Sequence, residues 1–218
     1  MYGLRGTKAA LTPAPKVKLR TPQHLLEISC NKMSTEPIIR LARREDVPEI
    51  LAMIKELAIY ENALDSVEAT EESLLATLSF ASSDAPTSTT TTSGYAKTFL
   101  ILAPAADANG GAPQVAGMAL FFHNYSTWRA APGIYLEDLF VRPEYRKRGY
   151  GKLLLCALAG ELMRVNGGRL EWSCLKWNES ALGFYKSLGA KRMDEWVGLR
   201  VEGDAVKRLA EGREGEGS

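Results

Sequence analysis

The sequence predicts a single mixed α/β domain whose central sheet is largely antiparallel and flanked by helices. Two long segments, 43–61 and 152–165, carry apolar residues at helical spacing. Runs of β-forming residues lie before, between and after them, in the order β, α, α, three strands, then α, β, α, β. A chain of 218 residues with 45% apolar side chains is large enough to bury one core.

The first part of this domain is predicted to be a strand followed by two helices. A short strand over 37–42 runs into the first helix, where apolar residues recur every three to four positions through Leu57. Asp46 is the expected N-cap of this helix. A second helix is expected from Thr70 to Leu78, with Thr70 as its cap.

Three strands are expected in the middle of the chain. They cover 98–105, 115–125 and 134–141, and Asn109-Gly-Gly between the first two is a hairpin signal. The segment 82–97 is rich in Ser and Thr and has no apolar period, which predicts a flexible loop.

The last part of the chain is expected to complete the sheet. A helix over 152–165 precedes a strand at 169–176. A short helix follows, with Asn178 as its cap and Gly189 as a left-handed stop. The run WVGLRVEG, 196–203, alternates apolar and polar residues and is expected to close the sheet.

The ends of the chain have a composition of their own. Residues 1–35 are expected to be a disordered basic extension, 36–210 the folded domain, and 211–218 a disordered tail. A mitochondrial presequence is the alternative interpretation of the basic beginning, and a cytoplasmic location is the default expectation.

Several functional classes are disfavoured by composition. Beyond the basic extension the chain carries more acidic than basic residues, which argues against nucleic acid as the main partner. No apolar run approaches the roughly 20 residues that a membrane-spanning helix needs. Cys30, Cys156 and Cys174 lack the spacing of a disulfide framework or a zinc site, so no metal is expected.

The stretch RPEYRKRGYG, 142–151, joins a predicted strand to a predicted helix. A glycine-rich turn at a helix start presents backbone N–H groups and a positive dipole, which together bind phosphate. Leu153 and Leu154 exclude the nucleoside triphosphate loop and the dinucleotide fingerprint. A solvated basic turn that only caps a helix is the alternative.

The pattern Arg146-x-x-Gly149-x-Gly151 resembles the acetyl-coenzyme A signature of the GNAT superfamily of N-acetyltransferases. The runs KELAIYE, HNYSTW, YLEDLFVRPEYR and KWNESALGFYKSLGA, in this order, are similar to the diamine (spermidine/spermine) and thialysine acetyltransferase branch. The resemblance implies a single GNAT-type domain, acetyl-CoA as cofactor, a small amine as substrate and a homodimer.

The resemblance also implies which residues bind acetyl-CoA. The pyrophosphate would lie on the amides of the turn, and the pantetheine arm along the predicted strand, which suits an arm that carries amide groups. The implied cofactor-binding residues are Leu139, Phe140, Val141, Arg146, Lys147, Arg148, Gly149, Tyr150, Gly151, Lys152, Asn178, Ser180 and Ala181.

Acetyl transfer to an amine needs a base and an acid. An alkylammonium has a reference pKa near ~10.4, so its deprotonation at neutral pH costs about 4 to 5 kcal/mol. Glu137 is the candidate base, with Asp138 expected on the opposite face of the strand, and Tyr185 matches the general acid of the family. The alternatives are a Glu137 paired with a nearby Arg and a Tyr185 that is simply core.

The resemblance places Tyr60, Glu61, Glu137 and Trp128 in the substrate site. Tyr125-Ser-Thr-Trp128 follows the thialysine branch, and carboxylates after the first helix are few, so a diamine or a basic amino acid such as thialysine, lysine or ornithine is expected as much as spermidine. The alternatives are a protein lysine or N-terminal acetyltransferase and a catalytically silent acetyl-CoA-binding regulatory module.

Overall fold

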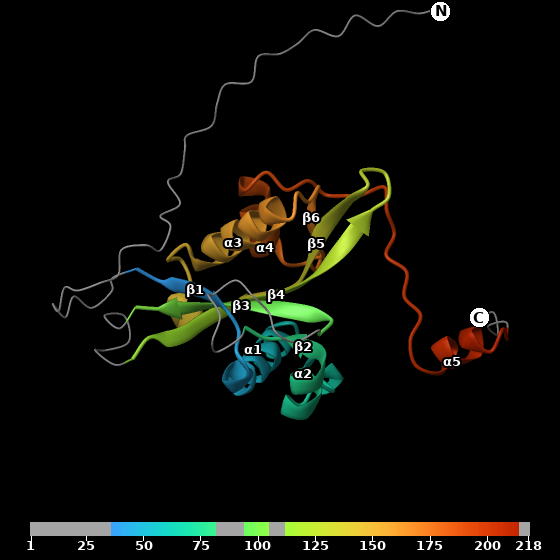
Figure 1. The fold of residues 1–218 in the computed structure, drawn as a ribbon, viewed down its shortest axis with the longest axis horizontal. Helices are drawn as coiled ribbons and strands as arrows, with labels where there is room; N and C mark the ends of the chain where they lie inside the picture. The colour runs from blue at the N-terminus through green and yellow to red at the C-terminus, as the bar shows by residue number, and fades with distance from the viewer. Residues whose placement is uncertain (1–35, 82–93, 105–111, 214–218) are drawn as a thin grey trace, which may run out of the picture.

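The computed structural model describes residues 36–81, 94–104 and 112–213. It confirms a mixed α/β domain built on a six-stranded sheet flanked by helices (Figure 1). The strands are β1 (Ile38–Leu41), β2 (Leu78–Ser79), β3 (Ala96–Ala103), β4 (Gln114–Ser126), β5 (Ala131–Val141) and β6 (Leu170–Trp172). The α-helices are α1 (Val47–Tyr60), α2 (Glu71–Thr77), α3 (Tyr150–Arg164), α4 (Glu179–Ser187) and α5 (Asp204–Ala210).

The sheet has the strand order β1-β3-β4-β5-β6, and β2 pairs with the start of β3. The pairs β1–β3, β3–β4 and β4–β5 are antiparallel, whereas β5–β6 and the short pair β2–β3 are parallel. The β5–β6 pair is possible because α3 carries the chain back across one face of the sheet between the two strands. The sheet is therefore largely antiparallel, with a helical crossover next to β5.

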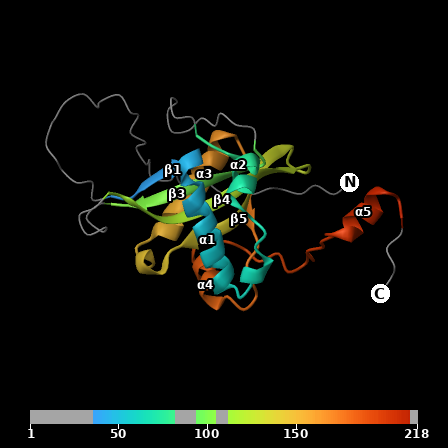
Figure 2. The same ribbon diagram turned by 90° about the horizontal axis from the view of Figure 1, so that it is seen from below.

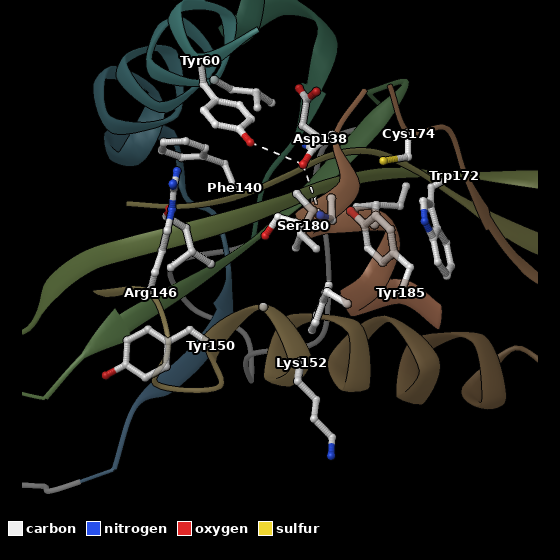
Figure 3. Close-up of a pocket in the computed structure, with 18 of the residues that line it drawn as sticks. Tyr60, Asp138, Phe140, Arg146, Tyr150, Lys152, Trp172, Cys174, Ser180 and Tyr185 are labelled. Atoms are coloured by element: carbon white, nitrogen blue, oxygen red, sulfur yellow. Dashed lines mark hydrogen bonds between the residues drawn. The ribbon is translucent and has the colours of Figure 1, made fainter. Parts of the chain in front are cut away.

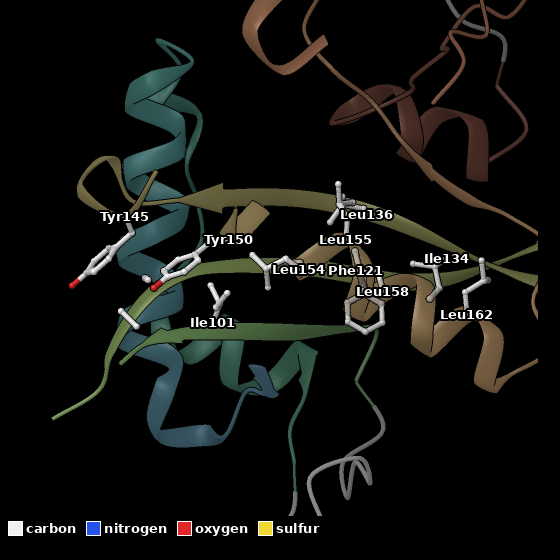
Figure 4. Close-up of a cluster of buried hydrophobic side chains, with 13 residues drawn as sticks. Ile101, Phe121, Ile134, Leu136, Tyr145, Tyr150, Leu154, Leu155, Leu158 and Leu162 are labelled. Carbon is white, nitrogen blue, oxygen red and sulfur yellow. The ribbon is translucent and has the colours of Figure 1, made fainter. Parts of the chain in front are cut away.

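Helices cover both faces of the sheet, so the protein has a core on each side. Helices α3 and α4 lie on one face and α1 and α2 on the other (Figures 1 and 2). Leu154, Leu158 and Leu162 of α3 pack on Phe121 and Leu136 of the sheet (Figure 4). The opposite core contains Val47, Ile50 and Met53 of α1, Leu74 of α2, and Leu100, Met118 and Phe140 of the sheet.

The three predicted N-caps hold the expected positions, and two of them cap their helix through the side chain. Thr70 accepts a hydrogen bond from Ser73 N at 3.1 Å, and Asn178 accepts one from Ala181 N at 3.1 Å. Asp46 is the N-cap residue of α1, but its side chain makes no hydrogen bond into that helix. Its carboxylate instead accepts from Arg40 at 2.6 Å and from the backbone N–H of Arg43 at 2.7 Å, so an ion pair ties the start of α1 to β1.

A β-bulge lies in β5 at Glu137. In the pairing with β4, Leu120 faces Asp138 while Phe121 faces Leu136, so Glu137 has no partner of its own. Leu136 belongs to the core under α3, but Phe140 belongs to the core under α1. The extra residue therefore reverses which face of the sheet the following side chains occupy.

The prediction for 196–203 is wrong. This segment forms no strand, and its large apolar side chains are exposed, Leu199 by 93%. A strand exists only when a neighbour supplies its ladder of hydrogen bonds, and the segment runs away from the sheet to α5 instead (Figure 1). The helix α5 itself was not predicted.

Several predictions lie outside the described residues. These are the basic extension at 1–35, the Asn109-Gly-Gly hairpin signal and all but the last four residues of the 82–97 loop. Of those four, Ala96 and Lys97 already belong to β3. Within 36–81, 94–104 and 112–213, no helix combines the length and apolar character needed to cross a bilayer.

Candidate active site

A cleft of about 940 Å³ opens where β5 and β6 diverge. The two strands pair only between Ile134–Leu136 and Leu170–Trp172, so β5 beyond Leu136 has no strand on that edge within the described residues. The cleft is lined by Leu57, Tyr60, Glu61, Leu136, Glu137, Asp138, Leu139, Phe140, Val141, Tyr145, Arg146, Lys147, Gly149, Tyr150, Gly151, Lys152, Trp172, Ser173, Cys174, Leu175, Asn178, Ser180, Ala181, Phe184 and Tyr185.

The turn between β5 and α3 offers backbone N–H groups to this cleft. Lys147 and Gly149 have positive φ values of 62° and 81°, so the chain reverses sharply just before α3. Gly149 is the N-cap of α3, and a Cβ added to it would meet nothing within 4 Å. Its backbone conformation, not crowding, favours glycine. The first-turn amides of Gly151 and Lys152 have no acceptor within α3, which is the arrangement of N–H groups that binds anions at helix starts.

Two cations of the turn are engaged by the protein itself. Arg142 contacts Glu49 at 2.8 Å and Glu56 at 3.1 Å, both on α1, and donates to the carbonyl of Val115 at 3.0 Å. Arg148 donates to the carbonyl of Glu144 at 3.3 Å and does not line the cleft. Arg142 thus anchors α1 to the sheet, and the predicted role of Arg148 in cofactor binding stays a prediction.

Arg146 and Lys152 do line the cleft, in different ways. The Nε of Arg146 donates to the carbonyl of Val141 at 2.9 Å, and its guanidinium lies 5.6 Å from the ring centre of Tyr60. Lys152 contributes the start of α3, whereas its ammonium points away from the other labelled residues (Figure 3). The positive character of the site therefore comes from the helix end, Arg146 and Lys147, which also lines the cleft.

Three carboxylates share the cleft: Glu61 at the end of α1, and Glu137 and Asp138 on β5. Asp138 was expected on the opposite face of the strand, but the bulge at Glu137 brings both into the cleft. Burial, and then the charges of Glu137 and Glu61, raise the pKa of Asp138 to about 6. Burial also raises the pKa of Glu61. The three carboxylates together form a negatively charged site suited to a cation.

Tyr185 on α4 lies against the other wall of the cleft. Its ring centre is 5.0 Å from that of Trp172 on β6 and 5.3 Å from that of Phe184. Burial, with the nearby Cys174 thiol and Glu61, raises the pKa of Tyr185 to about 12. The hydroxyl is therefore protonated at neutral pH and able to donate.

A pair of hydrogen bonds joins the two helices that border the cleft. The hydroxyl of Tyr60 on α1 donates to Asn178 Oδ1 at 3.3 Å, and the same oxygen accepts from Ala181 N on α4 at 3.1 Å (Figure 3). Asn178 therefore caps α4 and also contacts a residue proposed for substrate binding. The helix cap predicted for Asn178 is confirmed, whereas its role in cofactor binding stays a prediction.

Trp128 is placed elsewhere. It lies in the turn between β4 and β5, is 92% exposed, and is not among the residues that line the cleft. Several residues that line the cleft were not predicted as site residues from the sequence, among them Asp138, Trp172 and Cys174. Asp138 could have been found only by anticipating the bulge, whereas Trp172 and Cys174 follow from the divergence of β6.

The described part of the chain holds no cluster of three or more His, Cys, Asp or Glu side chains arranged for a metal ion. The cleft therefore combines a helix start with unpaired first-turn amides, three carboxylates and a protonated tyrosine.

Relatives of known activity resemble this chain over most of its length. The L-ornithine N5-acetyltransferase NATA1 of Arabidopsis thaliana is 34% identical over 197 residues, which cover 78% of this chain and 86% of the relative. The thialysine N-epsilon-acetyltransferase of Bos taurus is 35% identical over 181 residues, which cover 79% and 96%.

Solved structures share the fold. An integron cassette protein of V. cholerae superposes with a TM-score of 0.59 at 23% identity, covering 80% of this chain and 97% of its own. An aminoglycoside acetyltransferase from a soil metagenome gives a TM-score of 0.57 at 16% identity, covering 76% and 95%. The family model of the GNAT acetyltransferases matches residues 68–190. Together with the relatives, this match shows that the chain belongs to the GNAT family of acetyltransferases.

Proposed function

We propose that this chain transfers the acetyl group of acetyl-CoA to a primary amine of a small cationic substrate. The observation that carries the proposal is one cleft that combines an anion-binding helix start, three carboxylates and a protonated Tyr185. The names of the relatives, which acetylate ornithine and thialysine, support the same class of reaction.

The cleft fits acetyl-CoA in two ways. The amides at the start of α3, with Lys147 and Gly149 in left-handed conformation before them, suit a pyrophosphate. The open edge of β5 from Glu137 to Val141 suits an arm with amide groups, which can pair with it as a strand would. Bound there, acetyl-CoA would supply the activated thioester.

The carboxylates would hold the substrate and remove its proton. Glu61, Glu137 and Asp138 together attract an ammonium group, and within the described residues no cation forms an ion pair with either β5 carboxylate. A carboxylate of raised pKa is a better base than an ordinary one, because its proton affinity lies closer to that of the amine. Asp138 therefore joins Glu137 as a candidate base.

Tyr185 would act as the acid. Its hydroxyl, kept protonated by burial, would give its proton to the departing sulfur, whose thiol has a reference pKa near ~8.5. Its ring packs against Trp172 and Phe184, which limits the positions that the hydroxyl can take in the cleft. The tyrosine is thus both packed in the core, as one interpretation held, and exposed to the cleft.

The site favours a short substrate. All three carboxylates lie in the cleft, while Asp65 and Glu68, the acids that follow α1, are not among its lining residues. A long polyamine would have few further charges to meet. A side-chain amine of a basic amino acid, or a short diamine, is therefore the substrate class that we propose.

Steady-state assays with acetyl-CoA would test this function. We expect the highest kcat/KM among thialysine, ornithine, lysine and short diamines, and a lower value for spermidine. A peptide with a lysine or a free N-terminus is included as a competitor. Efficient turnover of the peptide alone would contradict the proposal, as would tight acetyl-CoA binding without turnover of any amine.

Binding of acetyl-CoA is tested separately by calorimetry on two matched variants. Gly149→Asp puts a carboxylate into the open space before α3, where the anion would lie, and should raise the Kd for acetyl-CoA at least about tenfold. Gly160→Asp adds the same charge on the exposed side of α3, where an added Cβ also meets nothing within 4 Å. Because Gly149 alone of the two has a positive φ, Gly149→Asn is the control for backbone strain at that position, and it should raise the Kd less than Gly149→Asp does. Equal effects of the two variants would remove the turn from the cofactor site.

A further inference from the structure

Arg146 lines the same cleft as three carboxylates and pairs with none of them. Its side chain is exposed, and within the described residues it forms no ion pair. Arg142, at the other end of the same turn, instead pairs with two glutamates of α1. An arginine that enters a cleft without a carboxylate partner there is available to an anionic group of a ligand.

The protein restrains the guanidinium of Arg146. Its Nε donates to the carbonyl of Val141 at 2.9 Å, and its central carbon lies 5.6 Å from the ring centre of Tyr60 and 5.8 Å from that of Phe140. Figure 3 shows the guanidinium beside these two rings and away from Lys152 at the start of α3. Because Nε is occupied, the two terminal NH2 groups remain, and such a pair binds both oxygens of a carboxylate at once.

The guanidinium lies close to a carboxylate position along β5. Asp138 pairs with Leu120 of β4, which belongs to the core under α1, as Phe140 itself does. Because paired residues face the same side of a sheet, Asp138 and Phe140 face the same side of β5. Two residues of a strand span about 7 Å, so Asp138 and the guanidinium over Phe140 are separated by a distance of that order.

We propose that Arg146 binds the α-carboxylate of the amine substrate, so that the substrate is a basic α-amino acid. This role rests on the acetyl transfer proposed above and adds a second group by which the substrate is held. With bonds of ~1.5 Å, the side-chain amine of extended ornithine or lysine lies roughly 6 to 8 Å from the carboxylate carbon. One such molecule can therefore place its ammonium at Asp138 and its carboxylate at Arg146.

A diamine lacks the group that Arg146 would bind. Its second ammonium would lie beside the guanidinium, and like charges repel each other. Arg146 would therefore select against diamines as well as for amino acids. The alternative is an Arg146 that binds only the pyrophosphate of acetyl-CoA, and it predicts no difference between amines with and without a carboxylate.

Calorimetry on the full-length chain saturated with CoA tests this role without any turnover. Lysine and lysinamide carry the same two amines, but lysinamide has an uncharged amide in place of the carboxylate. We expect lysine to bind at least about tenfold more tightly, which is the effect of hydrogen bonds between charged groups. Equal Kd values of the two ligands, or no measurable binding of lysine, would overturn the proposal.

Two adjacent substitutions then locate the contact. Arg146→Gln should bring the two Kd values to within about threefold of each other, whereas Lys147→Gln, which removes another cation of the cleft, should keep the preference for lysine. Arg146→Lys keeps the charge without the paired NH2 groups and should keep only part of the preference. A preference that survives in Arg146→Gln, or that is lost in Lys147→Gln, would assign the carboxylate to another group and refute the proposal.

Assays of turnover with the parent chain separate this role from the function on which it rests. If the chain acetylates diamines and binds lysine no more tightly than lysinamide, the acetyl transfer stands and the carboxylate subsite is refuted. If lysine is preferred through Arg146 and no amine is acetylated, the subsite stands and the proposed function is refuted.

Discussion

Asp46 and Asp138 are two carboxylates withdrawn from solvent, and their surroundings are opposite. Asp46 takes two hydrogen bonds from Arg40, at 2.6 and 2.8 Å, and one from the backbone of Arg43. Burial alone would raise the pKa of Asp46, but the hydrogen bonds from Arg40 and Arg43 outweigh it and lower the pKa. Asp138 sits beside Glu137 and Glu61, and its pKa is raised to about 6.

This difference in surroundings corresponds to a difference in role between the two aspartates. At the start of α1, a carboxylate is fully partnered and ties a helix to the sheet. In the cleft, Asp138 lies near two other carboxylates, and their repulsion lowers the stability of the fold. Such an arrangement is useful only if a cation binds there. Substitutions at the start of α1 should therefore change stability, whereas substitutions in the cleft should change activity. For the two aspartates, the change in stability should also have opposite signs.

The largest expected effect is on catalysis. Tyr185→Phe should lower kcat by about a hundredfold to ten-thousandfold, because it removes the proton donor for the leaving sulfur. The Kd for acetyl-CoA and the unfolding temperature should stay nearly unchanged, since the ring contacts with Trp172 and Phe184 remain. Rapid kinetics with a saturating amine would measure the decrease in kcat, and an unchanged kcat would show that Tyr185 is not the acid.

Asp46→Asn should destabilise the fold by about 3 kcal/mol, because it leaves the half-buried Arg40 without its charged partner. Urea unfolding would measure the change, with the exposed Asp65→Asn as a control that should stay within about 0.5 kcal/mol. Because the pKa of Asp46 is lowered in the folded state, its contribution is present above the unfolded pKa and is lost as the pH falls through the folded pKa. Equal stability of the variant and the parent would contradict this role.

Asp138→Asn should change stability in the other direction, by about 2 kcal/mol at pH 7.5, because it removes a charge that is desolvated and repelled. A carboxyl whose pKa is raised on folding opposes folding above its folded pKa, and this cost disappears below the unfolded pKa of 3.8. The gain should therefore vanish by about pH 4. Unfolding curves at both pH values test it, and a loss of stability at pH 7.5 would show that the carboxylate is partnered.

The smallest effect concerns the pH dependence of the reaction. With a substrate that stays cationic throughout, kcat/KM should rise about tenfold per pH unit up to about pH 6 and then level off, as Asp138 loses its proton. The Asp138→Asn variant should lose this break and have a lower plateau. A break that persists unchanged in the variant would assign it to another group.

Elements defined by neighbours in sequence were predicted well. The Thr70 cap, the Asn178 cap and the left-handed Gly189 each depend on a few adjacent residues. The turn from Arg146 to Lys152 was placed correctly for the same reason, since a glycine pattern between a strand and a helix is a local signal.

Features that depend on distant partners were missed. The bulge at Glu137 arises from the register with β4, which the sequence of β5 alone does not contain, so Asp138 was not expected beside Glu137 in the cleft. The segment 196–203 has the alternation of a strand, but whether it forms one depends on an edge beside it. Asp46 holds the predicted N-cap position of α1, but its ion pair with Arg40 follows from how β1 and α1 pack and was not predicted.

The bulge in β5 also gives this strand one residue more than its pairing needs. Deleting Glu137 would restore regular alternation from Leu136 onward, with Asp138 still opposite Leu120 and Phe140 still in the core beneath α1. Losing a regularly paired residue of β5 would instead turn the side chains beyond it to the other face. Glu137 is therefore the position at which this strand can lose a codon while the cores on both faces of the sheet are kept.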